Sequence, residues 1–391
     1  MLNRRSLRIK AMQNIFAFKH CQWANYHLAK DLIKEQFAPD LNSMERPDME
    51  LLNSNKQAAL ELFEISYSQK VVERKNGISG EVIAASENAM DYYYKQVKKD
   101  HEFLRKNMFS GAEGIYILYL QLLLLLVELA DIEEVEFEDK KGKLLHQNKS
   151  IQDFTLYFKN NRVIEKIRNN KNLEIESIRI KANWAGQRSL MKQWYKELIK
   201  DPDIEKFNAV KNKSFDDEKN LILHVVKKFI FKNELIKAYL EEQDQNWGEN
   251  RTIVKSMVSK TVKAIEEEED FELVSLSSNW EEDKTFFKHI FDQTIENDKY
   301  YEEIIARKTK NWDIDRIAAL DKIILKMALN EMINFPSIPI KVTINEYIEI
   351  SKNYSTPKSR QFINGILDVV AEELQKEGVI KKSGRGLIDN K

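Results

Sequence analysis

Residues 354–370 read YSTPKSRQFINGILDVV, and this stretch decides what kind of structure surrounds it. The Asn364-Gly365 pair on its own is typical of a hairpin turn between two strands. The apolar residues on both sides instead recur at helical spacing; they are Phe362, Ile363, Ile366, Leu367 and Val370. Thr356 followed by Pro357 is typical of a helix N-cap and the first helical position. The stretch therefore predicts a helix that contains a glycine.

That glycine needs a reason, because glycine inside a helix costs roughly 1 kcal/mol relative to alanine. The simplest interpretation is a close approach by a neighbouring helix, which the missing Cβ of Gly365 allows. Asn364 could then bridge the contact by hydrogen bonds. Phe362 is interpreted either as a core residue or as an aromatic ring on which an RNA base stacks.

The first turn of the same helix is basic. It contains Lys358, Ser359 and Arg360, and no acidic residue occurs between Ser351 and Leu367. A helix N-terminus presents free N–H groups and a partial positive charge, so this turn predicts a phosphate-binding site. The alternative is an ordinary solvated first turn.

The composition favours long helices in a soluble protein. The 391 residues are 42% apolar and 32% charged, and the whole chain has only 11 Gly and 6 Pro. So few turn-forming residues predict an all-α fold rather than many strands. The formal net charge is −1, so any nucleic-acid binding has to come from a local basic patch.

Three features bear on the compartment. A single cysteine, Cys21, excludes an intramolecular disulfide framework and fits a reducing, cytoplasmic environment. The N-terminus lacks the pattern of a signal peptide. The most apolar run, residues 115–132, is interrupted by Gln121 and ended by Glu128 after about 13 residues, so it is shorter than a membrane span. We therefore expect a helix buried in the protein and no membrane contact.

The periodicity predicts further helices along the chain. Residues 4–30 predict one helix that begins with the basic side chains of Arg4, Arg5 and Arg8, and no acid precedes Asp31. Residues 56–265 predict helix after helix, separated by segments such as SGAEG at 110–114. DKKGK, at 139–143, is either a turn between short strands or a helix end. The acidic run at 266–270 is interpreted as a solvated linker.

The C-terminal part gives sharper signals. Residues 279–312 predict one long amphipathic helix, and the next helix is expected to begin with Asp313 as its N-cap. Thr343 and Glu346 have the spacing of a capping box at the start of a further helix. Residues after 378 are polar and are expected to form a flexible tail.

Motifs for catalysis and metal binding are absent. No Gly-rich phosphate loop follows a strand, and none of the six histidines has metal-ligand spacing with a second His or Cys. We therefore expect no metal, no cofactor and no enzymatic activity.

Two segments resemble the NusB family of transcription antitermination factors. Residues 4–16, RRSLRIKAMQNIF, look like the family's first helix, and residues 312–370 are similar to its C-terminal half, above all in IPIKVTINEYIEISK and SRQFINGILD. The resemblance implies an all-α, NusB-like helical bundle with a large, mostly helical insertion, as in the long Bacteroidetes-type form. The implied divisions are residues 1–30 as the first helix, 31–270 as the insertion, 271–378 as the C-terminal bundle and 379–391 as the flexible tail.

The resemblance also implies a function and a set of contact residues. NusB-like proteins bind boxA RNA of ribosomal RNA leaders together with NusE, a small-subunit ribosomal protein, and act with other Nus factors on elongating RNA polymerase; no DNA contact is implied. The RNA face implied by the resemblance and by the basic N-terminus comprises Arg4, Arg5, Arg8, Gln13, Lys358, Arg360, Gln361, Phe362 and Asn364. The NusE-facing surface would contain Asp315 and Asp321, since acids complement a basic partner.

Two alternatives come from other functional classes. NusB-like domains also occur fused to ribosomal RNA cytosine methyltransferases, but this chain lacks the Gly-rich cofactor turn and the reactive cysteine such an enzyme needs. The second alternative is a protein–protein scaffold on the NusB fold that does not bind RNA. An RNA titration distinguishes it from the adaptor.

Overall fold

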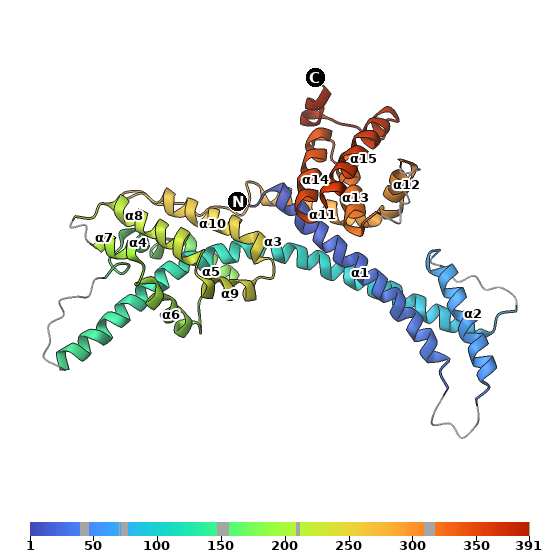
Figure 1. Cartoon of the computed structure of the whole chain (residues 1–391), viewed down its shortest axis with the longest axis horizontal. Helices are drawn as coiled ribbons and strands as arrows, with labels where there is room; N and C mark the ends of the chain where they lie inside the picture. Colours follow the sequence, from blue (N-terminus) through green and yellow to red (C-terminus); the bar gives the residue numbers. More distant parts are fainter. Residues whose placement is uncertain are drawn as a thin grey trace. The chain divides into compact units, whose positions relative to one another are not determined.

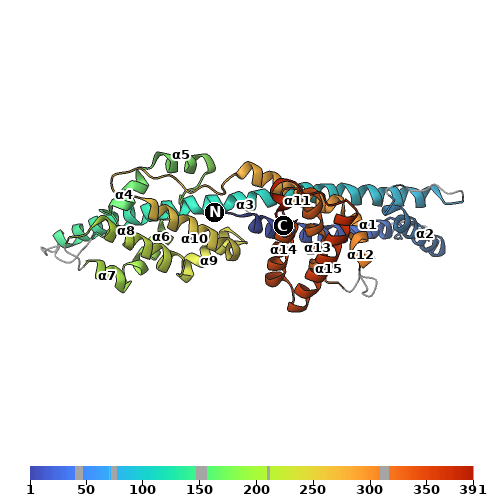
Figure 2. The same cartoon turned by 90° about the horizontal axis from the view of Figure 1, so that it is seen from above.

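The computed structural model describes residues 1–39, 47–69, 71, 77–146, 156–208, 212–308 and 317–390. Its elements, drawn in Figures 1 and 2, are α1 (Arg4–Gln36), α2 (Met49–Tyr67), α3 (Gly80–His146), α4 (Arg162–Arg168), α5 (Lys171–Ile180), α6 (Arg188–Leu198), α7 (Pro202–Asn208), α8 (Phe215–His224), the π-helical turn η1 (Val225–Ile230), α9 (Glu234–Gln243), α10 (Trp247–Ala264), α11 (Trp280–Glu296), α12 (Asp298–Lys308), α13 (Ala319–Asn334), α14 (Ile340–Tyr354), α15 (Pro357–Lys376) and the 3-10 helix η3 (Gly384–Asn390). No strand occurs in the described ranges, so the all-α prediction is confirmed.

The chain folds as two compact units whose boundaries differ from the divisions predicted from the sequence. The bundle unit comprises Arg4–Phe109 and Lys284–Lys391, and the insert unit comprises Met1–Asn3 and Ser110–Asp283. Residues 31–109, expected to belong to the insertion, therefore pack with the bundle. Helix α3 contributes its first part to the bundle unit and its second part to the insert unit.

Helix α13 lies at the centre of the bundle unit. Every residue from Ile323 to Met332 is buried, as expected of a helix enclosed on all sides. Helices α1, α12, α14 and α15 all pack against it. Helix α1 packs with an apolar face inward, because Leu7, Ala11 and Phe18 are buried.

The second half of α1 builds a separate core with α2 and the start of α3. Ala29, Ala59 and Ala85 are among its fully buried residues, and Phe63 fills the space between the helices. The small alanine side chains allow close helix packing. The hydroxyl of Ser86 donates to the carbonyl of Ala59 at 2.9 Å and thereby joins α3 to α2.

The insert unit is organised around the apolar second half of α3. Leu122, Leu126 and Leu129 are buried. The helix is long and apolar enough to span a membrane by length and composition, yet 61% of its most apolar window is buried inside the protein. Glu133 ends this stretch and accepts backbone N–H groups from residues 157–159 at 2.8–2.9 Å. The expectation that residues 115–132 form a buried helix is confirmed.

Several local predictions about helix ends are wrong. SGAEG and DKKGK both lie inside α3, so neither ends a helix. The segment expected to form one helix after residue 279 forms two, because Asn297 separates α11 from α12 and its side chain donates to the carbonyl of Gln293. Asp313 lies outside the described residues.

The predicted capping box and flexible tail are also corrected. Helix α14 begins at Ile340, three residues before Thr343, whose hydroxyl donates instead to Glu331 at 2.9 Å. In the tail, Lys382 donates to the carbonyl of Phe335 at 3.0 Å, and Ser383 donates to that of Pro336 at the same distance. These bonds fix the chain before η3.

Candidate nucleic-acid interface

The start of α15 has the geometry that its sequence predicts. The Thr356 hydroxyl accepts the backbone N–H of Ser359 at 3.2 Å, and Pro357 occupies the first helical position. Lys358, Arg360 and Gln361 are exposed. The two cations therefore lie beside the positive end of a capped helix, an arrangement that attracts phosphate.

The next turn of α15 differs from its prediction. Phe362 is half-buried, and the side-chain amide of Asn364 donates to Asp368 at 3.0 Å on the same helix. Gly365 is exposed, and a Cβ at this position would meet no described atom within 4 Å. The predicted close helix contact at Gly365 is therefore wrong, and the glycine leaves an open stretch of backbone on the exposed face.

The N-terminal basic residues divide into exposed and buried groups. The guanidinium of Arg5 donates to both carboxylate oxygens of Glu346, at 2.8 and 2.9 Å, and its side chain remains 45% exposed. Arg4 is half-buried, with its guanidinium carbon 5.0 Å from the Phe286 ring centroid. Gln13 is also half-buried. These residues keep part of their surface available to a ligand.

Arg8 requires a correction, because its side chain is only 4% exposed. Its Nε and Nη2 each donate to Glu331 at 2.7 Å, and Glu331 is fully buried. The hydroxyls of Thr343 and Tyr347 donate to the same carboxylate at 2.9 and 3.3 Å. Arg8 therefore joins α1 to α13 and α14 from the interior and is not accessible to RNA.

The environment of Arg8 stabilises its charged form. Burial alone lowers the pKa of Arg8, but the charge and hydrogen bonds of Glu331 raise it above its ordinary value. Burial raises the pKa of Tyr347, which the neighbouring Glu331 charge raises further. The cluster is thus a buried ion pair completed by two neutral hydroxyl donors.

Glu349 shows that the basic residues of α1 and α15 lie close together. Its pKa is lowered, mainly by the hydrogen bond from Lys352 and also by the charges of Lys352, Arg5 and Arg360. Arg5 comes from α1, Lys352 from α14 and Arg360 from α15. Lys352 pairs with Glu349, and the charges of Arg5 and Arg360 are close enough to act on the same exposed carboxylate, so cations from three helices contribute to a local basic patch that the net charge of −1 hides.

The two acids predicted to face a protein partner cannot both be placed. Asp315 lies outside the described residues. Asp321 is 3% exposed and accepts a hydrogen bond from the Ser355 hydroxyl. It therefore fixes the end of α14 against α13 and does not present its carboxylate to a partner, which corrects the prediction.

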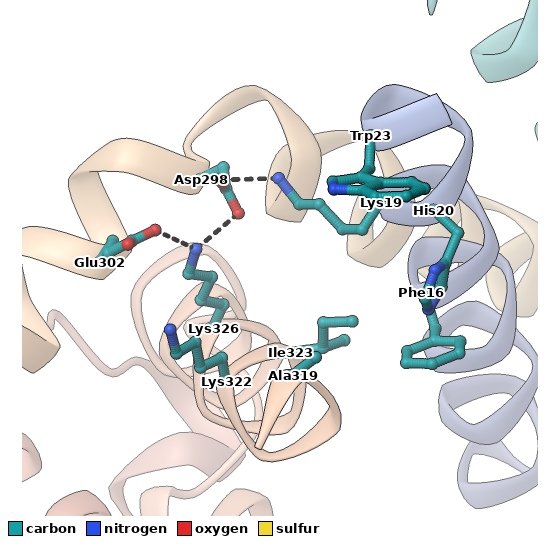
Figure 3. A pocket seen from close by; sticks show the side chains of 10 residues that line it. All are labelled: Phe16, Lys19, His20, Trp23, Asp298, Glu302, Ala319, Lys322, Ile323 and Lys326. Atoms are coloured by element: carbon teal, nitrogen blue, oxygen red, sulfur yellow. Dashed lines mark hydrogen bonds and ion pairs between the residues drawn. The ribbon is translucent and has the colours of Figure 1, made fainter. Parts of the chain in front are cut away.

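A groove of about 500 Å³ lies between α1, α12 and α13 in the bundle unit. Its lining includes Lys322, which follows Asp321 in the sequence. Figure 3 shows Phe16, Ala319 and Ile323 in the wall of the groove and Trp23 at its edge. Lys326 donates to Asp298 at 2.8 Å and to Glu302 at 2.6 Å, and Lys19 pairs with the other oxygen of Asp298 at 2.8 Å. The groove therefore has an apolar wall, with the charges of Lys19, Lys326, Asp298 and Glu302 paired along one side.

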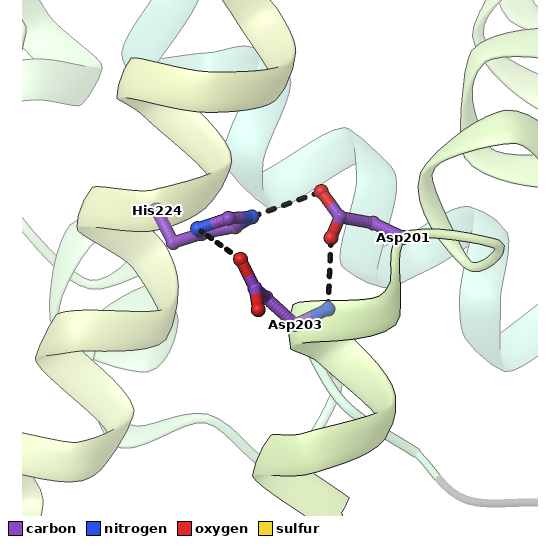
Figure 4. Close-up of side chains that lie close together, drawn as sticks. All are labelled: Asp201, Asp203 and His224. Atoms are coloured by element: carbon purple, nitrogen blue, oxygen red, sulfur yellow. Dashed lines mark hydrogen bonds and ion pairs between the residues drawn. The ribbon is translucent and has the colours of Figure 1, made fainter.

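The insert unit contains a His–Asp–Asp cluster that the search for His and Cys spacing missed. Figure 4 shows His224 between Asp201 and Asp203. Its Nε2 lies 2.9 Å from Asp201 and its Nδ1 3.6 Å from Asp203. Asp201 also accepts the backbone N–H of Asp203 at 2.9 Å. Because both ring nitrogens already face carboxylates, one by a hydrogen bond and the other by a longer ion pair, the cluster is explained by its own internal contacts.

Comparison with known proteins supports the resemblance stated above. Residues 251–372 match the NusB family. The transcription antitermination protein NusB of Salinibacter ruber is 43% identical over 105 residues, which cover 27% of this chain and 66% of that protein. The NusB protein of Chloroherpeton thalassium is 44% identical over 106 residues, 27% of this chain and 50% of the relative. That of Natranaerobius thermophilus is 40% identical over 91 residues, 23% and 66% respectively.

The similarity is confined to part of each protein. The chain spans between half and 66% of the length of these relatives. No solved structure matches the chain. The prediction of a NusB-type domain in the C-terminal part is confirmed.

Proposed function

We propose that this chain, whose residues 251–372 form a NusB family domain, binds boxA-type single-stranded RNA and acts as an adaptor in transcription antitermination. It acts with NusE and other Nus factors on elongating RNA polymerase in the cytoplasm, without catalysis and without a cofactor. The single observation that carries the proposal is the convergence of positive charge at Glu349, which pairs with Lys352 and is influenced by the charges of Arg5 and Arg360.

The proposed RNA face follows from that convergence. Phosphates bind at the first turn of α15, where Lys358 and Arg360 add their charges to the helix N-terminus. Arg5 extends the positive surface onto α1. Glu346 pairs with Arg5 and Glu349 pairs with Lys352 before RNA arrives, and phosphate oxygens then replace the carboxylates.

Base contacts require groups beside the phosphate track. The half-buried Phe362 has one part of its ring available for stacking, and Gln361 is exposed one residue away. The proposed RNA face also includes Asn364, Gln13 and Arg4, each of which is half-buried. The open backbone at Gly365 lets a nucleotide approach the helix more closely than any side chain would allow.

The groove shown in Figure 3 is the proposed contact for NusE in place of Asp321. Trp23, with 65% of its surface exposed, supplies the type of aromatic anchor that dominates protein interfaces. Trp23→Ala is expected to reduce the gain in RNA affinity that NusE provides while leaving binding of RNA alone unchanged. Leu28→Ala, an exposed apolar change on the same helix outside the groove, is the matched control.

The direct experiment is a titration of labelled boxA-type RNA with the full chain, with and without NusE, against a scrambled RNA of equal length. The adaptor predicts preference for the boxA sequence, tighter binding with NusE and a steep loss of affinity with salt. Equal binding of both RNAs would overturn sequence-specific recognition. No RNA binding together with retained NusE binding would favour the scaffold alternative.

A further inference from the structure

We propose that the insert unit carries a second RNA contact, a sequence-independent site for backbone phosphates formed by Lys227, Lys228, Lys232, Arg251 and Lys255. We call these five residues the insert patch. The inference rests on the proposed function, because it takes RNA to be the ligand of the chain. It adds a separate site in a region outside the compact unit that carries the proposed RNA face.

Two segments supply the cations, and neither contains an acid. Residues 219–233 and 251–265 each lack Asp and Glu, although the chain as a whole has 63 acidic residues. The first segment includes η1 and the second forms most of α10, and these elements pack against each other. The fold therefore brings two acid-free, basic segments to one place in the insert unit.

A buried aromatic pair fixes the geometry of the insert patch. Phe231 stacks on Trp247 with their ring centroids 5.8 Å apart, and both rings are 2% exposed. The ammonium of Lys255 lies 5.9 Å from the Phe231 ring centroid, and Arg251 donates to the Phe231 backbone carbonyl. The cations of α10 are thus attached to the residue that follows η1. A π-helical turn such as η1 is rare and often marks a functional site.

The cations of the insert patch repel one another. The pKa of Lys255 is lowered, mainly by burial and then by the charges of Arg251, Lys232, Lys227 and Lys228. Among the residues that the structure describes, no carboxylate oxygen forms an ion pair with any of the five. Lys206 lowers the pKa of Asp203 by a hydrogen bond, and the more distant charge of Lys228 lowers it slightly further, so this acid already pairs with a lysine outside the patch. An anionic ligand would relieve this repulsion.

The surroundings favour a phosphate backbone over a membrane. Lys228 and Lys232 are exposed, while Lys227, Arg251 and Lys255 are half-buried, so the charges are accessible from two elements. The large apolar side chains between them are buried, and a membrane-surface site requires exposed apolar residues that insert into the lipid. With no exposed aromatic ring for base stacking, the insert patch would contact phosphates alone and read no sequence.

The test compares two triple variants of the full chain. Lys227→Ala, Lys228→Ala and Lys255→Ala together remove three charges of the insert patch. Lys159→Ala, Lys192→Ala and Lys237→Ala remove three lysines of the same unit that are paired with carboxylates. Each protein is titrated with boxA-type RNA and with a longer scrambled RNA across a salt series, after circular dichroism has verified its helix content.

The proposal predicts that the patch variant binds scrambled RNA at least tenfold more weakly than the wild type. The slope of log affinity against log salt should fall in magnitude by about 2, at roughly 0.7 per lost phosphate contact. The control variant should retain the wild-type slope. Equal slopes for the patch variant and the wild type would overturn the inference. Polyglutamate that displaces RNA from the wild type as effectively as unlabelled RNA does would also overturn it, because it would indicate an acidic protein as the ligand.

The design separates this inference from the proposed function. If the wild type binds both RNAs without preference and the patch variant loses that binding, the insert patch is supported and boxA recognition fails. If the wild type prefers boxA and the patch variant keeps the wild-type slope on both RNAs, the proposed function is supported and the insert patch fails.

Discussion

Replacing Arg8 by alanine distinguishes a buried structural role from RNA contact. The change leaves the Glu331 carboxylate fully buried, with only the hydroxyls of Thr343 and Tyr347 as hydrogen-bond donors. Removing one partner of a buried ion pair costs about 3–5 kcal/mol. It also removes the contact of the guanidinium with the Phe286 ring, 5.2 Å from its carbon. The melting temperature of the bundle unit should fall by on the order of 10 °C.

The matched control is Arg5→Ala on the same helix. The Arg5–Glu346 pair has a 45% exposed arginine, and exposed pairs contribute only about 0–1 kcal/mol. A second control replaces both members of the buried pair, Arg8→Met with Glu331→Leu, which removes the uncompensated charge and should recover much of the stability. The two single variants therefore differ mainly in whether they leave a buried charge.

The assay must report on the bundle unit, because the chain folds as two units. Hydrogen exchange of peptides from α13 and α14 does so, alongside thermal unfolding followed by circular dichroism. Arg8→Ala should accelerate exchange in both helices, and Arg5→Ala should not. Wild-type exchange and melting in Arg8→Ala, combined with loss of RNA binding, would refute the reasoning and return Arg8 to the RNA face.

Three further predictions use single side chains. Glu349→Gln removes an acidic charge that offsets Lys352, Arg5 and Arg360, so RNA affinity measured by fluorescence anisotropy should rise by roughly threefold; a decrease would contradict the proposed face. Burial alone raises the pKa of Asp298, but Lys19 and Lys326 together lower it below its ordinary value. The contribution of Asp298 to the free energy of unfolding is therefore complete above about pH 4 and is lost as the pH falls through the pKa of Asp298 in the folded protein. The melting temperature of Asp298→Asn should therefore fall less than that of the wild type between about pH 5 and about pH 2.5. An equal fall would count against the contacts of Asp298 with Lys19 and Lys326. Gly365→Ala should stabilise α15 by about 1 kcal/mol, visible as a higher melting temperature, because space above Gly365 is open; a lower melting temperature would mean that the position is constrained.

The sequence predicts features that depend on neighbouring residues. The N-cap Thr356 and the first-turn Pro357 act within one turn, and the structure has both. The buried face of α1 follows from a spacing that only a helix satisfies. The basic first turn of α15 is predictable for the same reason, since Lys358 and Arg360 lie close together along the chain.

Features that depend on distant partners could not be predicted in this way. Arg8 and Glu331 are 323 residues apart, and nothing near Arg8 distinguishes it from the exposed Arg5. Thr343 and Glu346 have capping spacing, yet each is used in a contact with another helix. Gly365 illustrates a further limit, because the same residue type serves a close contact or an open surface.

The helix break predicted inside α3 is wrong for an energetic reason. Glycines at 111 and 114 favour a break, but α3 continues through them. The cost of roughly 1 kcal/mol for each is smaller than the stabilisation from burying the leucines that follow. Whether the helix continues is therefore decided by tertiary packing, which sets how much the buried leucines contribute.

The most direct test of the RNA face is the salt dependence of boxA-type RNA binding by the Arg5→Ala, Arg360→Ala double variant. The control is Lys34→Ala with Lys376→Ala, which removes one exposed cation from each of the same two helices. The account predicts that the double variant binds more weakly and that its salt slope falls in magnitude by about 1.4, while the control behaves as the wild type. An unchanged affinity and slope in the double variant would contradict the claim that α1 and α15 form one RNA-binding surface.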